Sequence, residues 1–188
     1  MVKSMCKISL ECLGKREVDM SGTPIEIERK YVIIKPMFSE LTDQGDVEIS
    51  EIDQTYLCSK AGETRRVRKR AYTDRVVYTE TVKRRIDHMS SYEDEREISE
   101  EEYIALLSEK ASGTVTLTKT RYALYYRGTC FEVDIYPEWK YTCILETELS
   151  SPDEKPEFPP LIKVIAEVTG DRRYSNAAMS ESFPPELV

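Results

Sequence analysis

Charged residues of one sign recur at a spacing of two along much of this chain. In an extended strand, alternate side chains point to the same face, so each set would present a single sign of charge to one side of a sheet. The acidic sets are Glu26/Glu28, Glu95/Glu97, Glu132/Asp134 and Glu146/Glu148, and the basic sets are Arg66/Arg68/Arg70, Lys83/Arg85 and Lys119/Arg121. An ordinary half-buried strand has mixed chemistry on its polar side. Such sorting therefore indicates charged faces that turn towards one shared space.

These residue types predict a site for a polyanion and a divalent metal. Hard cations such as Mg²⁺ or Mn²⁺ prefer several oxygen ligands, often completed by substrate phosphates. Arginine matches phosphate with its planar fork, and lysine adds a point charge. An unpaired buried charge costs several kcal/mol or more, so an enclosed space lined by such groups needs compensation by ion pairing or by a ligand. The alternative is a set of solvated faces, which suits the run 65–70 best.

Composition narrows the classes of partner. The chain has 188 residues, 33% of them charged, and a net charge of -8. A general nucleic-acid or anionic-membrane binder would instead have a basic footprint, so neither partner is expected. No apolar run approaches the roughly 18 residues of a membrane span, and the N-terminus does not read as a signal peptide. Five scattered cysteines without a CxxC motif predict reduced thiols in a cytoplasmic protein.

The charged sets fall on predicted strands joined mostly by short turns. The first strand begins at Ile25 and ends before Pro36. Further strands are predicted near residues 47–58, 63–71, 75–85, 92–98, 114–127, 129–136 and 141–150. About eight such strands favour a closed, mainly antiparallel β-barrel with a few flanking helices, an α+β fold. The interior of an eight-stranded barrel has room for side chains or one small ligand.

Two helices are predicted. Ser99 followed by Glu102 has the capping-box spacing at the start of the first. The second is expected after Pro159-Pro160 and is ended by Gly170, with an apolar side formed by Leu161, Ile162, Ile165 and Val168. Residues 37–44 are expected to form a short helix or a loop, and the twelve tyrosines to pack on the outer face of the sheet.

Several short motifs, in order, resemble those of the CYTH domain, the fold of the triphosphate tunnel metalloenzymes. EIERK at 26–30 resembles the family's ExExK signature, and QTYL at 54–57 resembles its QxYL element. The other matching motifs are RVR (66–68), TVK (81–83), EREI (95–98), TKTRY (118–122), FEVDIY (131–136), LETEL (145–149) and VTGDRRYSN (168–176). The resemblance covers roughly residues 25–180 and is greatest to the small single-domain bacterial members. It leaves residues 1–24 as an N-terminal extension and 181–188 as a tail.

The resemblance implies a role for each matched charged residue. Metal ligands would be Glu26, Glu28, Asp134, Glu146 and Glu148, with Glu95, Glu97 and Glu132 in support. The phosphates would be bound by Lys30, Arg66, Arg68, Lys83, Lys119, Arg121 and Arg173. Glu28, Glu148 and Lys83 would be the catalytic residues, with a carboxylate or a second metal activating water. The implied cofactor is Mg²⁺ or Mn²⁺, bound inside a tunnel with a charged interior.

The function implied is metal-dependent hydrolysis of inorganic triphosphate, or of a related compound, to diphosphate and phosphate. Within the same family, a class IV-type adenylyl cyclase and a thiamine triphosphatase are alternatives. From another class, the chain could be a polyphosphate- or nucleotide-binding module without turnover. Binding alone would need chiefly the basic residues, so the intact acidic pairs favour an enzyme. The sequence leaves the preferred substrate and the oligomeric state open.

Overall fold

A computed structural model describes residues 17–18, 24–42 and 47–188. Apart from residues 17, 18 and 24, the predicted N-terminal extension lies outside the described residues. None of the described helices has the length and apolarity that a membrane-spanning helix needs.

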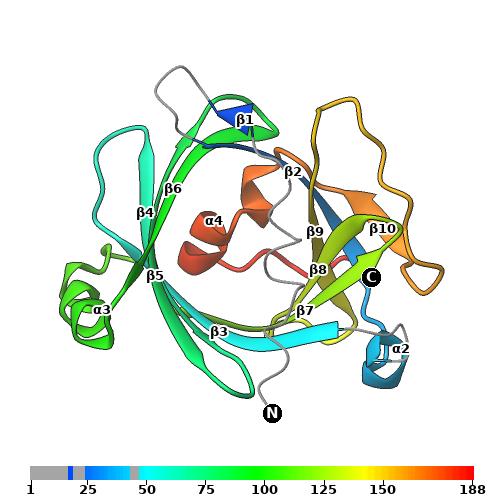
Figure 1. Ribbon diagram of the computed structural model, residues 1–188, viewed down its shortest axis with the longest axis horizontal. Helices are drawn as coiled ribbons and strands as arrows, with labels where there is room; N and C mark the ends of the chain where they lie inside the picture. The colour runs from blue at the N-terminus through cyan, green and yellow to red at the C-terminus, as the bar shows by residue number, and fades with distance from the viewer. Residues whose placement is uncertain (1–16, 19–23, 43–46) are drawn as a thin grey trace, which may run out of the picture.

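Eight antiparallel strands close into a ring (Figure 1). The strands are β2 (Pro24–Ile34), β3 (Val47–Leu57), β4 (Glu63–Ala71), β5 (Val76–Arg85), β6 (Ser90–Ile98), β7 (Leu117–Tyr126), β8 (Thr129–Ile135) and β9 (Thr142–Glu148). Their order around the ring is β2-β6-β5-β4-β3-β7-β8-β9, and pairing of β9 with β2 completes it. This confirms the predicted closed antiparallel architecture, with strand bounds close to those expected.

Strand β2 is the junction of the ring because four strands pair with it along its length. Strand β6 pairs only with Ile25–Ile27, and β9 pairs with the opposite edge from Glu28 to Ile34. The edge of β2 that β6 leaves free pairs with β10 (Val164–Glu167), and Val164 lies opposite Ile33. A two-residue strand, β1 (Glu17–Val18), also pairs with β2.

The prediction of a helix after Pro159-Pro160 is therefore wrong, because part of that segment is strand β10. Val164 and Ile165 are β-branched, which suits a strand, and the free edge of β2 offers backbone partners. Residues Val164 and Ile165 remain exposed, so there is no buried helical stripe. The helical spacing of the apolar residues was outweighed by backbone hydrogen bonding to a strand remote in sequence.

The helices are short and lie outside or at one end of the ring. They are α2 (Phe38–Thr42), α3 (Glu100–Leu106) and α4 (Asn176–Glu181), with 3₁₀ turns η1 (Leu107–Glu109) and η2 (Arg172–Tyr174). The predicted cap of α3 is confirmed, because the Glu102 amide donates to Ser99 Oγ. Tyr103 of α3 packs on the outer face of the ring with Leu57, Val67 and Ile98.

A second apolar layer covers the outer face of β2, β7, β8 and β9. Tyr31 and Ile33 of β2 contribute to it, together with Phe131 and Leu145. All four side chains are buried. Because these residues alternate with the charged ones along the same strands, packing of the outer layer fixes which side chains face inwards.

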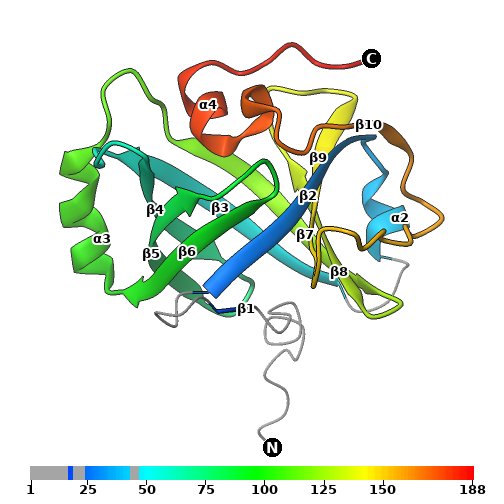
Figure 2. The same cartoon turned by 90° about the horizontal axis from the view of Figure 1, so that it is seen from above.

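One end of the ring is filled by an apolar plug, which we define as Trp139, Tyr174 and Met179 with the strand residues that they contact. Figures 1 and 2 show α4 within the outline of the ring and at one end of it. The plug also includes Val32, Tyr56, Leu117 and Ile144 of the strands, and Tyr136, which directly follows β8. Tyr56 and Tyr136 thus face the interior, so the expectation that the tyrosines pack outside is wrong for these two.

The cysteines differ in state. Cys58 and Cys143 are free thiols, as expected. Cys130 is disulfide-bonded, and the expectation of reduced thiols is wrong for this residue.

Truncation of the plug should destabilise the fold. Met179 is 1% exposed within the plug, so we expect Met179→Ala to lower the free energy of unfolding by about 2–5 kcal/mol. Ile104→Ala is the control, because Ile104 is 60% exposed on α3 and its loss should change stability by no more than about 0.5 kcal/mol. Urea denaturation followed by tryptophan fluorescence measures both, and equal effects would contradict the burial of Met179.

Candidate functional site

A charged cavity of about 940 Å³ lies inside the ring. Its wall includes most of the charged residues that the sequence singled out. These are Glu26, Glu28, Lys30, Arg66, Arg68, Lys83, Glu95, Arg121, Glu132, Glu146 and Glu148. Residues that are scattered over more than a hundred positions of sequence therefore face one space.

Four other predicted site residues do not line this cavity. Lys119 and Asp134 are buried beneath its wall, where the Lys119 ammonium forms an ion pair with the Asp134 carboxylate. Glu97 is exposed, and Arg173 points to solvent and pairs with Asp171 at 2.6 Å. The neighbouring Arg172 lines the cavity instead.

The pairing of β2 with β9 brings acidic residues together. Its register places Glu28 directly opposite Glu148 and Lys30 opposite Glu146. The Lys30 ammonium lies 2.7 Å from a Glu146 oxygen and 3.5 Å from a Glu28 oxygen. One wall of the cavity therefore carries three carboxylates and a single lysine at the ring closure.

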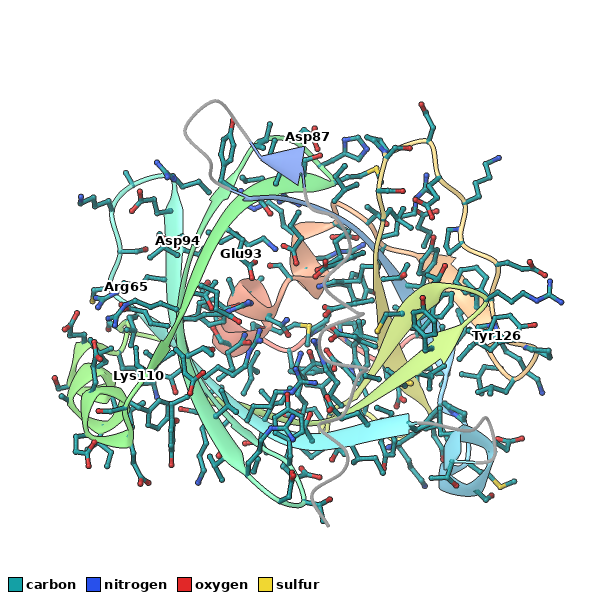
Figure 3. The ribbon with its side chains drawn as sticks, in the orientation of Figure 1. Arg65, Asp87, Glu93, Asp94, Lys110 and Tyr126 are labelled. Carbon is teal, nitrogen blue, oxygen red and sulfur yellow. The ribbon has the colours of Figure 1, made fainter. Side chains whose placement is uncertain are left out.

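Strands β4, β5 and β6 form a facing wall that is largely basic. Arg66 and Arg68 occupy alternate positions on β4, and Lys83 lies on β5. A carboxylate that the sequence analysis missed, Glu93 on β6, lies 3.4 Å from Arg66 and 3.3 Å from Lys83. Figure 3 shows Glu93 towards the interior, whereas its neighbour Asp94 is on the other side of the strand. Glu93 stands two positions before Glu95, so an extension of the acidic pair by one step would have found it.

This basic wall contains a hydrogen-bond donor without a partner and an excess of positive charge, both of which suit an anion. Arg66 Nε is buried and has no hydrogen-bond partner among the described residues. Burial and the neighbouring Arg66 guanidinium lower the pKa of Arg68, which indicates a local excess of positive charge. Arg68 donates two hydrogen bonds of 3.3 Å to Gln54 and lies 3.8 Å from Glu95.

Arg121 of β7 is held in a network of carboxylates from β8 and β9. Its guanidinium pairs with Asp134 at 2.6 Å and with Glu146 at 2.7 Å, and it also pairs with Glu132. Burial opposes the charged form of Arg121, but these carboxylates outweigh that effect and raise its pKa. Burial also disfavours ionised Asp134, yet Arg121 and Lys119 outweigh this and lower its pKa. Arg121 and Asp134 are thus held ionised at neutral pH.

Glu26 is the exception among the acidic residues. Burial raises its pKa from the ordinary 4.5 to about 8, against the opposing effect of Lys83, and the carboxylates of Glu93 and Glu28 raise it further. The carboxyl groups of Glu26, Glu28 and Glu93 thus share the positive charge of Lys83. A cation that replaced the proton on Glu26 would relieve this repulsion.

Comparison with known proteins identifies the fold. The sequence matches no protein-family model and no curated protein. The structure is similar to the crystal structure of the inorganic triphosphatase NE1496, with a TM-score of 0.54 and 26% identity over 85% of this chain and 97% of that one. A second structure, described as the hypothetical protein NE1496, gives a TM-score of 0.51 and 26% identity over 85% and 99% of the two chains. The chain has the triphosphate tunnel fold of the CYTH family.

A third structure shares the tunnel fold at lower identity. The PH1819 protein from Pyrococcus horikoshii OT3 has a TM-score of 0.50 and 19% identity over 68% of this chain and 80% of that one. The resemblance found in the short motifs is therefore confirmed at the level of the fold. The charged cavity described above is the interior of the tunnel.

The tunnel carboxylates are the right chemical type for a hard divalent cation, although their arrangement is not a preformed metal site. Among the described residues, no three acidic, histidine or cysteine side chains converge to hold a metal ion. The carboxylates are instead engaged by lysine and arginine. The raised pKa of Glu26 beside other carboxylates is the observation that fits a cation, and Mg²⁺ commonly takes only one or two protein carboxylates together with phosphate and water.

The raised pKa of Glu26 gives a testable pH dependence. The folded chain keeps a proton on Glu26 between pH 4.5 and about 8, where the unfolded chain has released it. This contribution to stability is therefore fully present below pH 4.5 and is lost as pH rises through about 8. We expect Glu26→Gln, measured by urea denaturation with a chelator present, to lose less stability than the unaltered protein between about pH 5 and about pH 8.

Glu101→Gln is the matched control. Glu101 is exposed on α3, and this variant should keep the pH dependence of the unaltered protein. Parallel curves for the unaltered protein and Glu26→Gln would contradict a protonated Glu26.

Proposed function

We propose that this protein is a divalent-metal-dependent phosphoanhydride hydrolase that converts inorganic triphosphate to diphosphate and phosphate. The observation that carries the proposal is the facing of an acidic wall and a basic wall across one enclosed cavity. A phosphate chain would meet Arg66, Arg68 and Lys83 on one side, and a metal would meet carboxylates on the other. The similarity to the inorganic triphosphatase NE1496 supports the same reaction class.

The residues suited to hold the metal are Glu26, Glu28, Glu146 and Glu148, with Asp134 and Glu132 supporting them through Arg121. A bound Mg²⁺ or Mn²⁺ would supply charge neutralisation and polarisation of phosphoryl oxygens. The unpartnered Arg66 Nε and the excess positive charge around Arg68 would bind and orient the phosphates.

Hydrolysis of a phosphoanhydride depends mainly on positioning and on stabilising charge. Lys30 and Lys83 lie among the carboxylates and would neutralise the phosphoryl oxygens nearest to the acidic wall. Glu28 or Glu148 would accept a hydrogen bond from the attacking water and orient it. The apolar plug would exclude bulk water from one end of the cavity, which strengthens these electrostatic contacts.

A substrate screen tests the reaction. We expect phosphate release from inorganic triphosphate with Mg²⁺ or Mn²⁺ and none with chelator. ATP and thiamine triphosphate serve as competing substrates, and production of cyclic AMP from ATP would favour the cyclase. Binding of triphosphate by calorimetry without release of phosphate under any metal condition would favour the non-hydrolytic binding module.

The acidic and basic walls should differ in their kinetic effects. Glu28→Gln keeps the size of the side chain but removes a charge, so we expect kcat to fall by about a hundredfold or more while triphosphate binding weakens less. Arg68→Ala should weaken binding and turnover together, because its phosphate contact exists in the ground state and the transition state alike.

Glu101→Gln and Arg84→Ala are the matched controls, since neither residue lines the cavity. Steady-state phosphate release measures kcat and KM for all four variants. If Glu28→Gln and Arg68→Ala keep the rates of the controls, the cavity is not the active site.

A further inference from the structure

The plug contacts the charged layer of the cavity at two points. At the first, the Tyr136 hydroxyl donates to the side-chain oxygen of Asn176, the first residue of α4, at 2.5 Å. At the second, the backbone carbonyl of Tyr174 accepts a hydrogen bond from the Lys30 ammonium at 3.4 Å. The short segment from Tyr174 to Asn176 is therefore attached to the charged layer through two different side chains.

Tyr136 is the first link of a chain of buried contacts. Its hydroxyl oxygen accepts from the Lys119 ammonium at 3.4 Å, and that ammonium lies 5.5 Å from the centre of the Tyr136 ring. Lys119 also forms an ion pair with Asp134. All three side chains belong to residues that are at most 2% exposed. Because bulk water does not reach this ammonium, its stability depends on the Tyr136 hydroxyl and the Asp134 carboxylate.

Asp134 connects Lys119 to Arg121. Both carboxylate oxygens of Asp134 accept from the Arg121 guanidinium at 2.6 Å, and one of them, Oδ2, also pairs with Lys119. The two cations thus share a single oxygen. If the Lys119 ammonium moved closer to that oxygen, it would compete with Arg121 for it and change the orientation of the guanidinium.

Arg121 and Lys30 together fix the carboxylate of Glu146. Arg121 Nη2 lies 2.7 Å from Oε2 of Glu146, and the Lys30 ammonium lies 2.7 Å from Oε1. Each oxygen therefore has its own cation. Each cation is connected to the plug, Lys30 directly and Arg121 through the chain that begins at Tyr136. The two connections end on a carboxylate that is suited to hold the metal.

We propose that Tyr136 is a positioning residue for the acidic wall of the cavity. Its hydroxyl fixes the Lys119 ammonium, and Lys119 in turn leaves the shared oxygen of Asp134 available to Arg121. Arg121 then holds the Glu146 carboxylate in place. This inference rests on the proposed hydrolase function, because the carboxylate so positioned would serve that reaction. It gives Lys119 a role other than the phosphate contact that the sequence implied, since Lys119 does not line the cavity.

Tyr136→Phe tests the proposal because it removes one oxygen atom and keeps the ring. The ring centroid lies 6.4 Å from that of Trp139 and 5.3 Å from that of Phe183, and these contacts remain in the variant. We expect kcat for phosphate release from triphosphate to fall by about tenfold or more, as when an outer group that orients a ligand is lost. KM should change much less, because Arg66 and Arg68 on the facing wall are unaffected.

Asn176→Ala tests the other side of the same hydroxyl. Without its acceptor on α4, the Tyr136 hydroxyl is free to rotate, so we expect changes in the same direction but of smaller size. Circular dichroism establishes that each variant is folded, and Asn176→Ala takes the place of Tyr136→Phe if the latter is not.

A second readout does not depend on turnover. In protein labelled with ¹⁵N at arginine, the Nε–H group of Arg121 gives a nuclear magnetic resonance signal that is identified by its absence from Arg121→Lys. Because this group donates to Asp134 at 2.6 Å, we expect Tyr136→Phe to shift the signal. The spectra are recorded with chelator and without any phosphate compound, so that only contacts within the protein contribute.

Two controls separate positioning from a loss of stability. Leu41→Ala truncates a fully buried side chain of α2 in the outer apolar layer, so it should destabilise the fold but leave kcat and the Arg121 signal unchanged. Tyr125→Phe is the matched loss of a hydroxyl, from a tyrosine that is 44% exposed and lines neither the cavity nor the plug, and it should change neither readout. Urea denaturation measures the stability of each variant.

The outcomes distinguish this inference from the proposed function. If Tyr136→Phe keeps the kcat of the controls, or leaves the Arg121 signal unshifted, Tyr136 is not a positioning residue. A loss of kcat that only follows stability, and so appears equally in Leu41→Ala, would also overturn the inference. A selective fall in kcat together with a shifted signal would support it. If the unaltered protein releases no phosphate, the hydrolase proposal fails, and the signal alone decides whether Tyr136 positions Arg121.

Discussion

The enclosure of many charges of both signs inside one small ring is the constraint on which this structure depends. Each ionised group withdrawn from water carries a desolvation cost, which only opposite charges at short range or a bound ligand can offset. The ring meets this requirement through shared contacts, such as those of Arg121 with three carboxylates. Where compensation is incomplete, burial and neighbouring carboxylates raise the pKa of Glu26 despite its ion pair with Lys83, and Arg66 Nε has no hydrogen-bond partner among the described residues.

The interior is divided along its axis by polarity. Inward-facing residues near one end, such as Tyr56 and Tyr136, are aromatic members of the plug, whereas inward-facing residues further along the ring are charged. Hydrogen bonds link the two regions: the Lys119 ammonium donates to the Tyr136 hydroxyl at 3.4 Å, and the Lys30 ammonium donates to the backbone carbonyl of Tyr174 at 3.4 Å. The Tyr136 hydroxyl donates in turn to Asn176 at the start of α4. The plug therefore supports the charged layer as well as closing the end of the ring.

Much of the fold was predictable because its strands are marked by charge as well as by apolar alternation. One-signed pairs at a spacing of two fixed the inward face, and the register of β2 with β9 agrees with them residue by residue. Strand β10 was not predictable in the same way, since its apolar spacing also suits a helix and its strand state depends on the free edge of β2. The plug was missed because Tyr174 and Met179 acquire their partners only through long-range contacts.

The candidate site was predicted in composition but not in all of its positions. The pairs on β2 and β9 and the arginines on β4 do face the cavity, because strand alternation places them there. Arg173 faces solvent while Arg172 lines the cavity, since a 3₁₀ turn does not follow the strand period that served elsewhere. The spacing of residues in the sequence predicts which side chains share a face only where the backbone geometry is regular.

Closure of the ring by β2 and β9 has a consequence for how the protein folds. The acidic wall exists only when the first and last strands of the ring are paired, although Glu28 and Glu148 are separated by most of the chain. Pairing of such distant segments is entropically slow and tends to follow local hairpin formation. The carboxylates of this wall would then assemble in the final step of folding, so that the nascent or partly folded chain presents charged hairpins without the enclosed cavity.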